Sequence, residues 1–491
     1  MASPGGGAPP GRAAGAGRAV PSAPSGPAVI TAVSSDGTYL TDQYGNPRLF
    51  AGEDIWSIVA NAGRWNSGNY QSTFDTYFSQ RAAQGYTAAE VSLVASQDPN
   101  DNWPATTYAD WDGALPFSGA TGGFAGVDPL TTPNSTFWAR RDYMFSSAAR
   151  NGITVVANFP GVGPSAMGAP TGVPASNGGA NWSSAQWQAY GTFLGSRYKH
   201  QPNIIWICGD GTFGSYNSGL SDWLVTARAA GDTHIITYQG GDETSSRLGF
   251  GSDNAGADPE AFMVNAEMDW VYTYNVSYPG VIAAITLEPS PSDVVQGRIP
   301  VVWGDGDYLA SSTTAPQTDT HLEQNLIWWA MSSGACGWST GDNDIFGWGS
   351  GADALVTSKS FYSATIPAIT GLVNSLHGWW KLRPDSANTL VTSGRGTQTP
   401  PISTSGSPYT DNSDSYVTAA YAADGSLALI YCAQHFSITI DQTKMAGGYT
   451  ATWYDPATAA ATPTTAGSSY NSTGLGNNST GFADWLLVLK G

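Results

Sequence analysis

Short apolar runs alternate with amphipathic segments through the first three quarters of the chain. Each apolar run has the length of a strand, and most are followed by apolar residues at helical spacing. In residues 71–84, for example, Phe74, Tyr77 and Phe78 occupy positions i, i+3 and i+4. The pattern predicts strands over 48–54, 86–93, 153–159, 203–208, 234–240, 268–275, 299–308 and 334–344, and helices over 71–84, 136–150, 184–199, 221–230, 320–332 and 361–376.

Eight strands separated mostly by helices predict an α/β fold, namely a (β/α)8 TIM barrel over residues 29–384. A short hairpin, with the segments ITAV and TYLT, precedes the first of these strands. An open doubly wound sheet is the alternative arrangement. We disfavour it because no glycine-rich phosphate-binding turn follows the first strand.

The pattern changes after Pro384. Residues 385–414 are rich in Ser, Thr, Gly and Pro, and the short apolar runs beyond them have no helical periodicity. Strands at this spacing are typical of a β-sandwich. We therefore expect a small C-terminal antiparallel β-sandwich domain over residues 385–491, with strands near 415–422, 427–433, 438–440, 449–455 and 484–490.

Residues 1–28 form an unusual N-terminal segment, in which 21 of the 28 residues are Ala, Gly or Pro. Such a segment cannot bury a core and predicts an extended arm. It lacks the apolar stretch of a secretory signal. Three explanations fit: a secreted protein whose signal has been removed, a cytoplasmic protein, or a virion tail component whose arm binds other tail proteins. We expect a protein that acts outside the cell, either secreted or carried on a virion tail.

Charge and composition narrow the class of ligand. The chain has 19 Lys+Arg against 38 Asp+Glu, so it lacks the cations that nucleic acid or an anionic membrane would require. It contains 19 Trp and 23 Tyr, and no apolar run reaches the length of a membrane span. Aromatic faces stack on sugar C–H groups, and carboxylates bind sugar hydroxyls. The composition therefore favours a polysaccharide or oligosaccharide as the partner, and no cysteine or histidine motif predicts a metal or another cofactor.

Acidic residues follow several predicted strands, at the barrel end that carries the chemistry of this fold. Asp210 stands out because it follows a wholly apolar strand and has glycines on both sides. Glycosidic bond cleavage needs two carboxyl groups, one as acid and one as nucleophile or base. Asp54 and Asp342 are also explained as helix caps. The candidates for sugar binding are Glu53, Trp56, Glu90, Tyr238, Glu243, Tyr274, Trp303, Asp307, Tyr308 and Asn343.

Two other chemistries are less well supported. Asp342, Asn343 and Asp344, or Asp98 and Asp101, offer oxygen ligands for a metal ion, but neither stretch matches a complete calcium loop. A Ser-His-Asp hydrolase would need a nucleophile elbow, and the chain has no Gly-x-Ser-x-Gly sequence.

Several segments carry a family resemblance. The sequences GNPRLFAGEDIW (45–56), FSQRAAQGYTAAEV (78–91), YGTFLGSRYKHQPNIIWICGD (190–210), GACGWSTGDNDIFGW (334–348) and YTATWYDPATA (449–459) occur in the order seen in apiosidase-like glycoside hydrolases. The chain therefore resembles that family, whose barrel is often followed by a small β-domain named for collagen binding. A phage tail-associated member of the family would explain the N-terminal arm.

The resemblance implies catalytic roles for two acids. Asp210 matches one catalytic carboxylate of the family, and Asp305 stands where the family has a Glu after the seventh strand. Two further positions depart from the family: Gln239-Gly240 replaces His-Pro, and Tyr274 replaces Gln. These changes predict a substrate other than the family's best-known one.

The sequence thus predicts a glycoside hydrolase that cleaves a pentose- or furanose-containing polysaccharide, or a cell-wall polysaccharide, with a pair of carboxylates. The alternative is a carbohydrate-binding adhesin without catalysis, such as a phage minor tail protein that recognises a host wall glycan. A purely structural virion or wall protein would leave the acidic strand ends unexplained.

Overall fold

The computed structural model describes most of the chain. The described residues are 26–94, 109–119, 127–159, 183–208, 217–239, 244–245, 265–272, 299–304, 306, 308–309, 316–396 and 416–491. Residues 1–25 of the predicted arm therefore lie outside the described residues.

The described strands of the first domain confirm the predicted barrel. Eight strands lie side by side in parallel, in the order β7-β6-β5-β4-β3-β11-β10-β9. The two ends of this order are joined by hydrogen bonds from Glu267 N–H to Ile236 O at 2.9 Å and from Thr237 Oγ1 to Met268 O at 2.6 Å. A short strand, β8, pairs antiparallel with β9. The bounds are β3 Phe50–Asp54, β4 Ala88–Ser92, β5 Thr154–Asn158, β6 Ile204–Cys208, β7 Ile235–Tyr238, β8 Thr244–Ser245, β9 Asp269–Tyr272, β10 Val301–Trp303 and β11 Gly337–Gly341.

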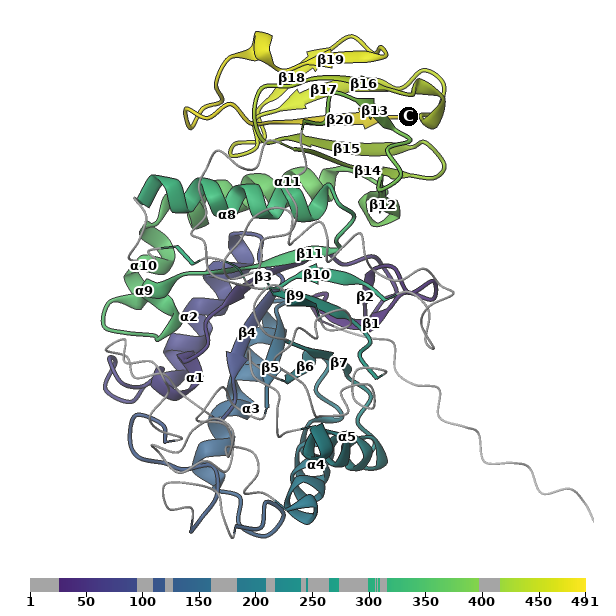
Figure 1. The fold of residues 1–491 in the computed structure, drawn as a ribbon. Coiled ribbons are helices and arrows are strands. Elements are labelled where there is room, and N and C mark those ends of the chain that lie inside the picture. Colours follow the sequence, from purple (N-terminus) through teal and green to yellow (C-terminus); the bar gives the residue numbers. More distant parts are fainter. Residues whose placement is uncertain are drawn as a thin grey trace, which may run out of the picture.

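Helices surround this sheet (Figure 1). Several begin where the side chain of an Asn or Ser accepts a backbone N–H of the first turn; Ser183 forms a complete capping box with Gln186. No helix among the described residues is long and apolar enough to cross a bilayer. The bounds are α1 Ile58–Asn61, α2 Tyr70–Ala83, α3 Ser135–Arg150, α4 Ser184–Tyr198, α5 Asn217–Ala229, α8 Pro316–Met331, α9 Asn343–Phe346, α10 Ala352–Ser358 and α11 Ile366–Ser375.

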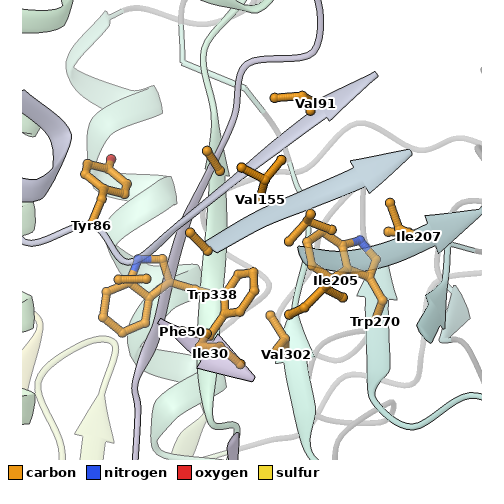
Figure 2. Close-up of a cluster of buried hydrophobic side chains, with 14 of the residues drawn as sticks. Ile30, Phe50, Tyr86, Val91, Val155, Ile205, Ile207, Trp270, Val302 and Trp338 are labelled. Carbon is orange, nitrogen blue, oxygen red and sulfur yellow. The ribbon is translucent and has the colours of Figure 1, made fainter. Parts of the chain in front are cut away.

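Large apolar side chains form the core of the barrel domain (Figure 2). The rings of Phe50 and Trp270 meet edge to face, with their centroids 5.8 Å apart. A Cβ atom at Gly304 would lie only 2.0 Å from the Trp270 indole, so that position must lack a side chain. The N-terminal end of the barrel is covered by the hairpin of β1 (Ile30–Val33) and β2 (Leu40–Asp42). The backbone N–H of Ile30 donates to Thr154 Oγ1 at 2.8 Å.

The C-terminal domain is the predicted antiparallel sandwich. One described sheet has the strand order β12-β14-β15-β20-β17-β18, and a second has the order β13-β16-β19. The first sheet begins with β12 at Leu382, slightly before the predicted start at 385. The bounds are β12 Leu382–Pro384, β13 Val391–Ser393, β14 Val417–Ala422, β15 Leu427–Cys432, β16 Ser437–Ile440, β17 Thr450–Tyr454, β18 Ala461–Thr464, β19 Ser469–Asn471 and β20 Trp485–Lys490.

The larger sheet of the sandwich packs on the barrel through α8 and α11 (Figure 1). Successive residues of β15 serve different cores because side chains alternate along a strand. Leu429 and Tyr431 belong to the core of the barrel, whereas Ile430 belongs to the core of the sandwich. The Trp328 indole N–H of α8 also donates to Pro456 O at 2.9 Å. The two domains therefore share one continuous apolar interface.

We predict that Leu429→Ala weakens α8 as well as the β-domain. Truncating a buried leucine costs about 2–5 kcal/mol of unfolding free energy, because apolar burial is lost and a cavity is left. Hydrogen exchange should show faster exchange of the α8 amides.

Leu487→Ala is the matched control, because Leu487 is equally buried but belongs to the sandwich core. It should destabilise the β-domain and change α8 exchange less. Equal α8 exchange in the two variants would contradict the shared interface.

Candidate functional site

Two buried carboxylates meet at the C-terminal end of the barrel. Asp54 at the end of β3 is paired in register with Glu90 of β4. Adjacent strands lie about 4.8 Å apart, and register partners point to the same face. Asp54 lies four residues after Phe50 and therefore on the same face of β3, and Phe50 packs inside the barrel against Trp270. Both carboxylates thus face the barrel interior. Ser92 lies two residues after Glu90 and on the same face of β4, and its register partner is Asn158 of β5. Polar side chains therefore extend from Asp54 across three neighbouring strands.

Asp54 is held by donors from two segments. The Tyr308 hydroxyl donates to Asp54 Oδ2 at 2.5 Å, and the Trp56 backbone N–H donates to Oδ1 at 3.1 Å. The Tyr308 ring lies against Gly341, where a Cβ atom would be 2.1 Å from the ring. Asp54 was expected either at a strand end with catalytic potential or as a helix cap. The structure places it at the strand end, bonded to Trp56, while α1 begins after Ser57.

Aromatic rings form one wall beside these carboxylates. Trp56 stacks on Phe346 with a centroid distance of 6.2 Å and an interplanar angle of 7°. Phe346 in turn lies 5.4 Å from Tyr308. Trp56 is buried, and its indole nitrogen has no hydrogen-bond partner among the residues that the structure describes. The structure thus brings together three of the predicted binding residues, Trp56, Glu90 and Tyr308.

Glu53 faces the opposite side of β3. Its carboxylate accepts hydrogen bonds from Arg81 at 2.5 and 2.6 Å and from the Tyr77 hydroxyl at 2.5 Å, all from α2. Burial raises the pKa of Glu53, and the Arg81 charge opposes that rise. Burial lowers the pKa of Arg81, but Glu53 and the surrounding tyrosines together outweigh it, so the pKa of Arg81 is raised. The geometry gives Glu53 a structural contact between sheet and helix rather than a place inside the barrel.

The other described candidates do not join this cluster. Trp303 is fully buried, and its register partners Trp338 and Val271 place it on the helix-facing side, as for Glu53. Tyr238 is paired with Cys208 and lies buried at the end of β7, where burial raises the pKa of its hydroxyl. Asn343 is exposed in α9. Asp210, Glu243, Tyr274, Asp305 and Asp307 lie outside the described residues, so their roles remain predictions.

Asp342 is committed to protein contacts. Its carboxylate caps α9 through the Asp344 N–H and also accepts Lys359 Nζ and the Tyr362 hydroxyl. Among the described residues, no three His, Cys, Asp or Glu side chains group as metal ligands. The second metal candidate, Asp98 with Asp101, lies outside the described residues.

Sequence reasoning missed Phe346 and undervalued Asp54. The signal for Asp54 was available, because strand alternation places it on the face opposite Glu53. Phe346 could not be found from the pattern, since it acts through its stacking on Trp56 from a distant segment.

We predict that Glu53→Gln strongly destabilises the protein. The substitution keeps the side-chain volume but leaves the buried Arg81 guanidinium without its counter-charge, which costs about 3–5 kcal/mol. Denaturant unfolding measures the change.

Asp424→Asn provides the matched acid-to-amide control. Asp424 pairs with Lys381 at 2.8 Å, but both side chains are about half exposed, and surface pairs contribute little. A similar loss of stability in both variants would rule out a special role for the Glu53 pair.

Comparisons with known proteins agree with this geometry. The chain matches the family model described as "Apiosidase-like, catalytic domain" over residues 34–368. Residues 407–490 match the model described as "Putative collagen-binding domain of a collagenase". No curated protein shows significant sequence similarity to the chain.

Solved structures share the fold along nearly the whole chain. One, titled as a glycoside hydrolase, has a TM-score of 0.66 at 17% identity and covers 95% of this chain and 97% of its own. Another, a glycoside hydrolase family 5 protein from Bacteroides vulgatus, has a TM-score of 0.65 at 18% identity and covers 94% of this chain and 93% of its own. At 17% and 18% identity, these similarities show a shared fold and nothing more. Because the catalytic-domain model spans most of the chain, the protein belongs to the apiosidase-like family.

Proposed function

We propose that this protein is a glycoside hydrolase that cleaves a pentose- or furanose-containing polysaccharide, or a cell-wall polysaccharide. The observation that carries the proposal is the pair of buried carboxylates, Asp54 and Glu90, at the C-terminal end of a barrel of the apiosidase-like family. In this fold, the strand ends at that face carry the reacting groups.

Asp210 and Asp305 are the proposed catalytic carboxylates. In the sequence they follow β6 and β10, the fourth and seventh strands of the barrel. One would protonate the leaving oxygen, and the other would act as nucleophile or as the base that activates water. Cleavage by a pair of carboxylates uses no metal or organic cofactor.

Asp54 and Glu90 would support this pair. Carboxylates bind sugar hydroxyls, and neighbouring negative charges favour the protonated form of an adjacent acid. The Tyr308 hydroxyl fixes Asp54 in place at 2.5 Å. The aromatic wall of Trp56, Phe346 and Tyr308 offers apolar surface to the C–H face of a sugar ring.

The sequence at the end of the fifth strand supports a substrate that differs from the family's best-known one. Gln239, where the resemblance leads one to expect His, is buried, and its backbone N–H donates to the backbone oxygen of Cys208 at 3.0 Å. An amide binds a sugar hydroxyl without a titrating group. This change argues for a rebuilt pocket on the same barrel.

The test is reducing-sugar release from a panel of plant and bacterial wall polysaccharides. Wild type should release sugar from at least one member. Asp210→Asn and Asp305→Asn should each lower the rate at least about 100-fold, because each removes a proton-transferring or nucleophilic carboxylate.

Asp424→Asn is the control, since it changes an exposed acid of the β-domain and should retain wild-type activity. If no polysaccharide is cleaved but one is bound, the protein is an adhesin on the same barrel. Full activity of Asp210→Asn would remove that residue from the mechanism.

A further inference from the structure

Trp65 has a solvent exposure that sets it apart from the other described tryptophans. Its side chain is 47% exposed, whereas ten others are almost completely buried. It lies between α1 and α2, in the connection that follows β3. This connection leaves the same barrel end that carries Asp54.

The exposed ring is held in a fixed position. The Trp65 indole N–H donates to Trp348 O at 3.1 Å, and the Asn61 amide donates to Gly347 O at 2.9 Å. Two bonds therefore join the connection after β3 to the connection after β11. Trp348 is itself buried, packs edge to face on Tyr77, and has a φ of 52°. A bulky residue rarely adopts this left-handed backbone, which costs free energy that the surrounding contacts must offset.

The connection that carries Trp65 is also internally braced. The Gly68 N–H donates to Gly63 O at 2.9 Å, and the Asn66 amide donates to Thr73 Oγ1 at 2.6 Å. A braced loop loses little entropy when a ligand binds to it. The Trp65 ring is neither packed in a core nor carried on a loosely held loop, so its exposure needs another explanation.

We infer that Trp65 is a sugar-binding platform on the rim of the barrel, where the outer part of a polysaccharide chain stacks on its indole face. A fixed aromatic ring with its N–H already bonded inside the protein presents its π-face to the ligand, which suits the C–H face of a neutral sugar. Arg64 and Ser67 are exposed beside it and offer donors to sugar hydroxyls. The inference deepens the proposed function, because the chain bound at Trp65 is the one cleaved at the barrel mouth.

Binding is measured by affinity gel electrophoresis in an Asp210→Asn background, so that the polymer is not degraded. The probes are arabinoxylan, arabinogalactan and a purified bacterial wall polysaccharide. At least one should retard the Asp210→Asn protein. Trp65→Ala should weaken that retardation about five- to tenfold, because the stacking surface is lost. Trp65→Phe, which keeps a ring but not the N–H, should bind with intermediate strength.

Tyr44→Ala is the matched control. Tyr44 is 46% exposed, so it is an aromatic of similar accessibility, but it lies in the turn after β2 at the other end of the barrel. Its loss should leave retardation unchanged. Thermal unfolding of each variant shows that the fold is intact.

The inference is overturned if Trp65→Ala is retarded as strongly as its parent, or if no probe retards the parent. The proposed function fails separately. If Asp210→Asn still cleaves, or wild type cleaves nothing, while Trp65-dependent retardation remains, the platform stands and the hydrolase does not.

Discussion

The filling of the barrel interior is the constraint on which the rest of the structure depends. The rings of Phe50 on β3 and Trp270 on β9 fill the inside of the barrel. Side chains at some neighbouring positions would collide with the groups packed there, so those positions are glycines. A Cβ atom at Gly337 would lie 1.9 Å from Phe50 O, and one at Gly341 would lie 2.1 Å from the Tyr308 ring. Absent side chains therefore set how closely β11 approaches β3 and where Tyr308 meets Asp54.

Two neighbouring acids of β3 point to opposite sides of the sheet. Glu53 ties the sheet to α2 through Arg81, and Asp54 faces inward beside Glu90. Both are buried acids at the end of β3, and the side of the sheet that each faces decides which groups it contacts. Burial alone does not distinguish these two acids, whereas the face of the strand that each occupies does.

The sequence predicted the eight barrel strands, their helical connections and the C-terminal sandwich, because each depends on local periodicity. Features that depend on distant contacts were not predictable in this way. The stacking of Phe346 on Trp56 and the split of β15 between two cores, through Leu429 and Ile430, need the three-dimensional arrangement. Of the candidate site, position along the strands singled out Glu90, Trp56 and Tyr308, which lie near one another in the structure and whose binding roles stay predictions. It could not separate Glu53 from Asp54 without the register.

The hairpin at the N-terminal end of the barrel has a consequence for orientation. Gln43 and Tyr44 bind the backbone oxygens of Pro27 and Gly26, and Figure 1 shows this hairpin on the side of the barrel opposite α9. The chain therefore enters the barrel at the pole opposite the carboxylates. Any support joined ahead of residue 26 would therefore lie at the end of the barrel opposite Asp54 and Glu90.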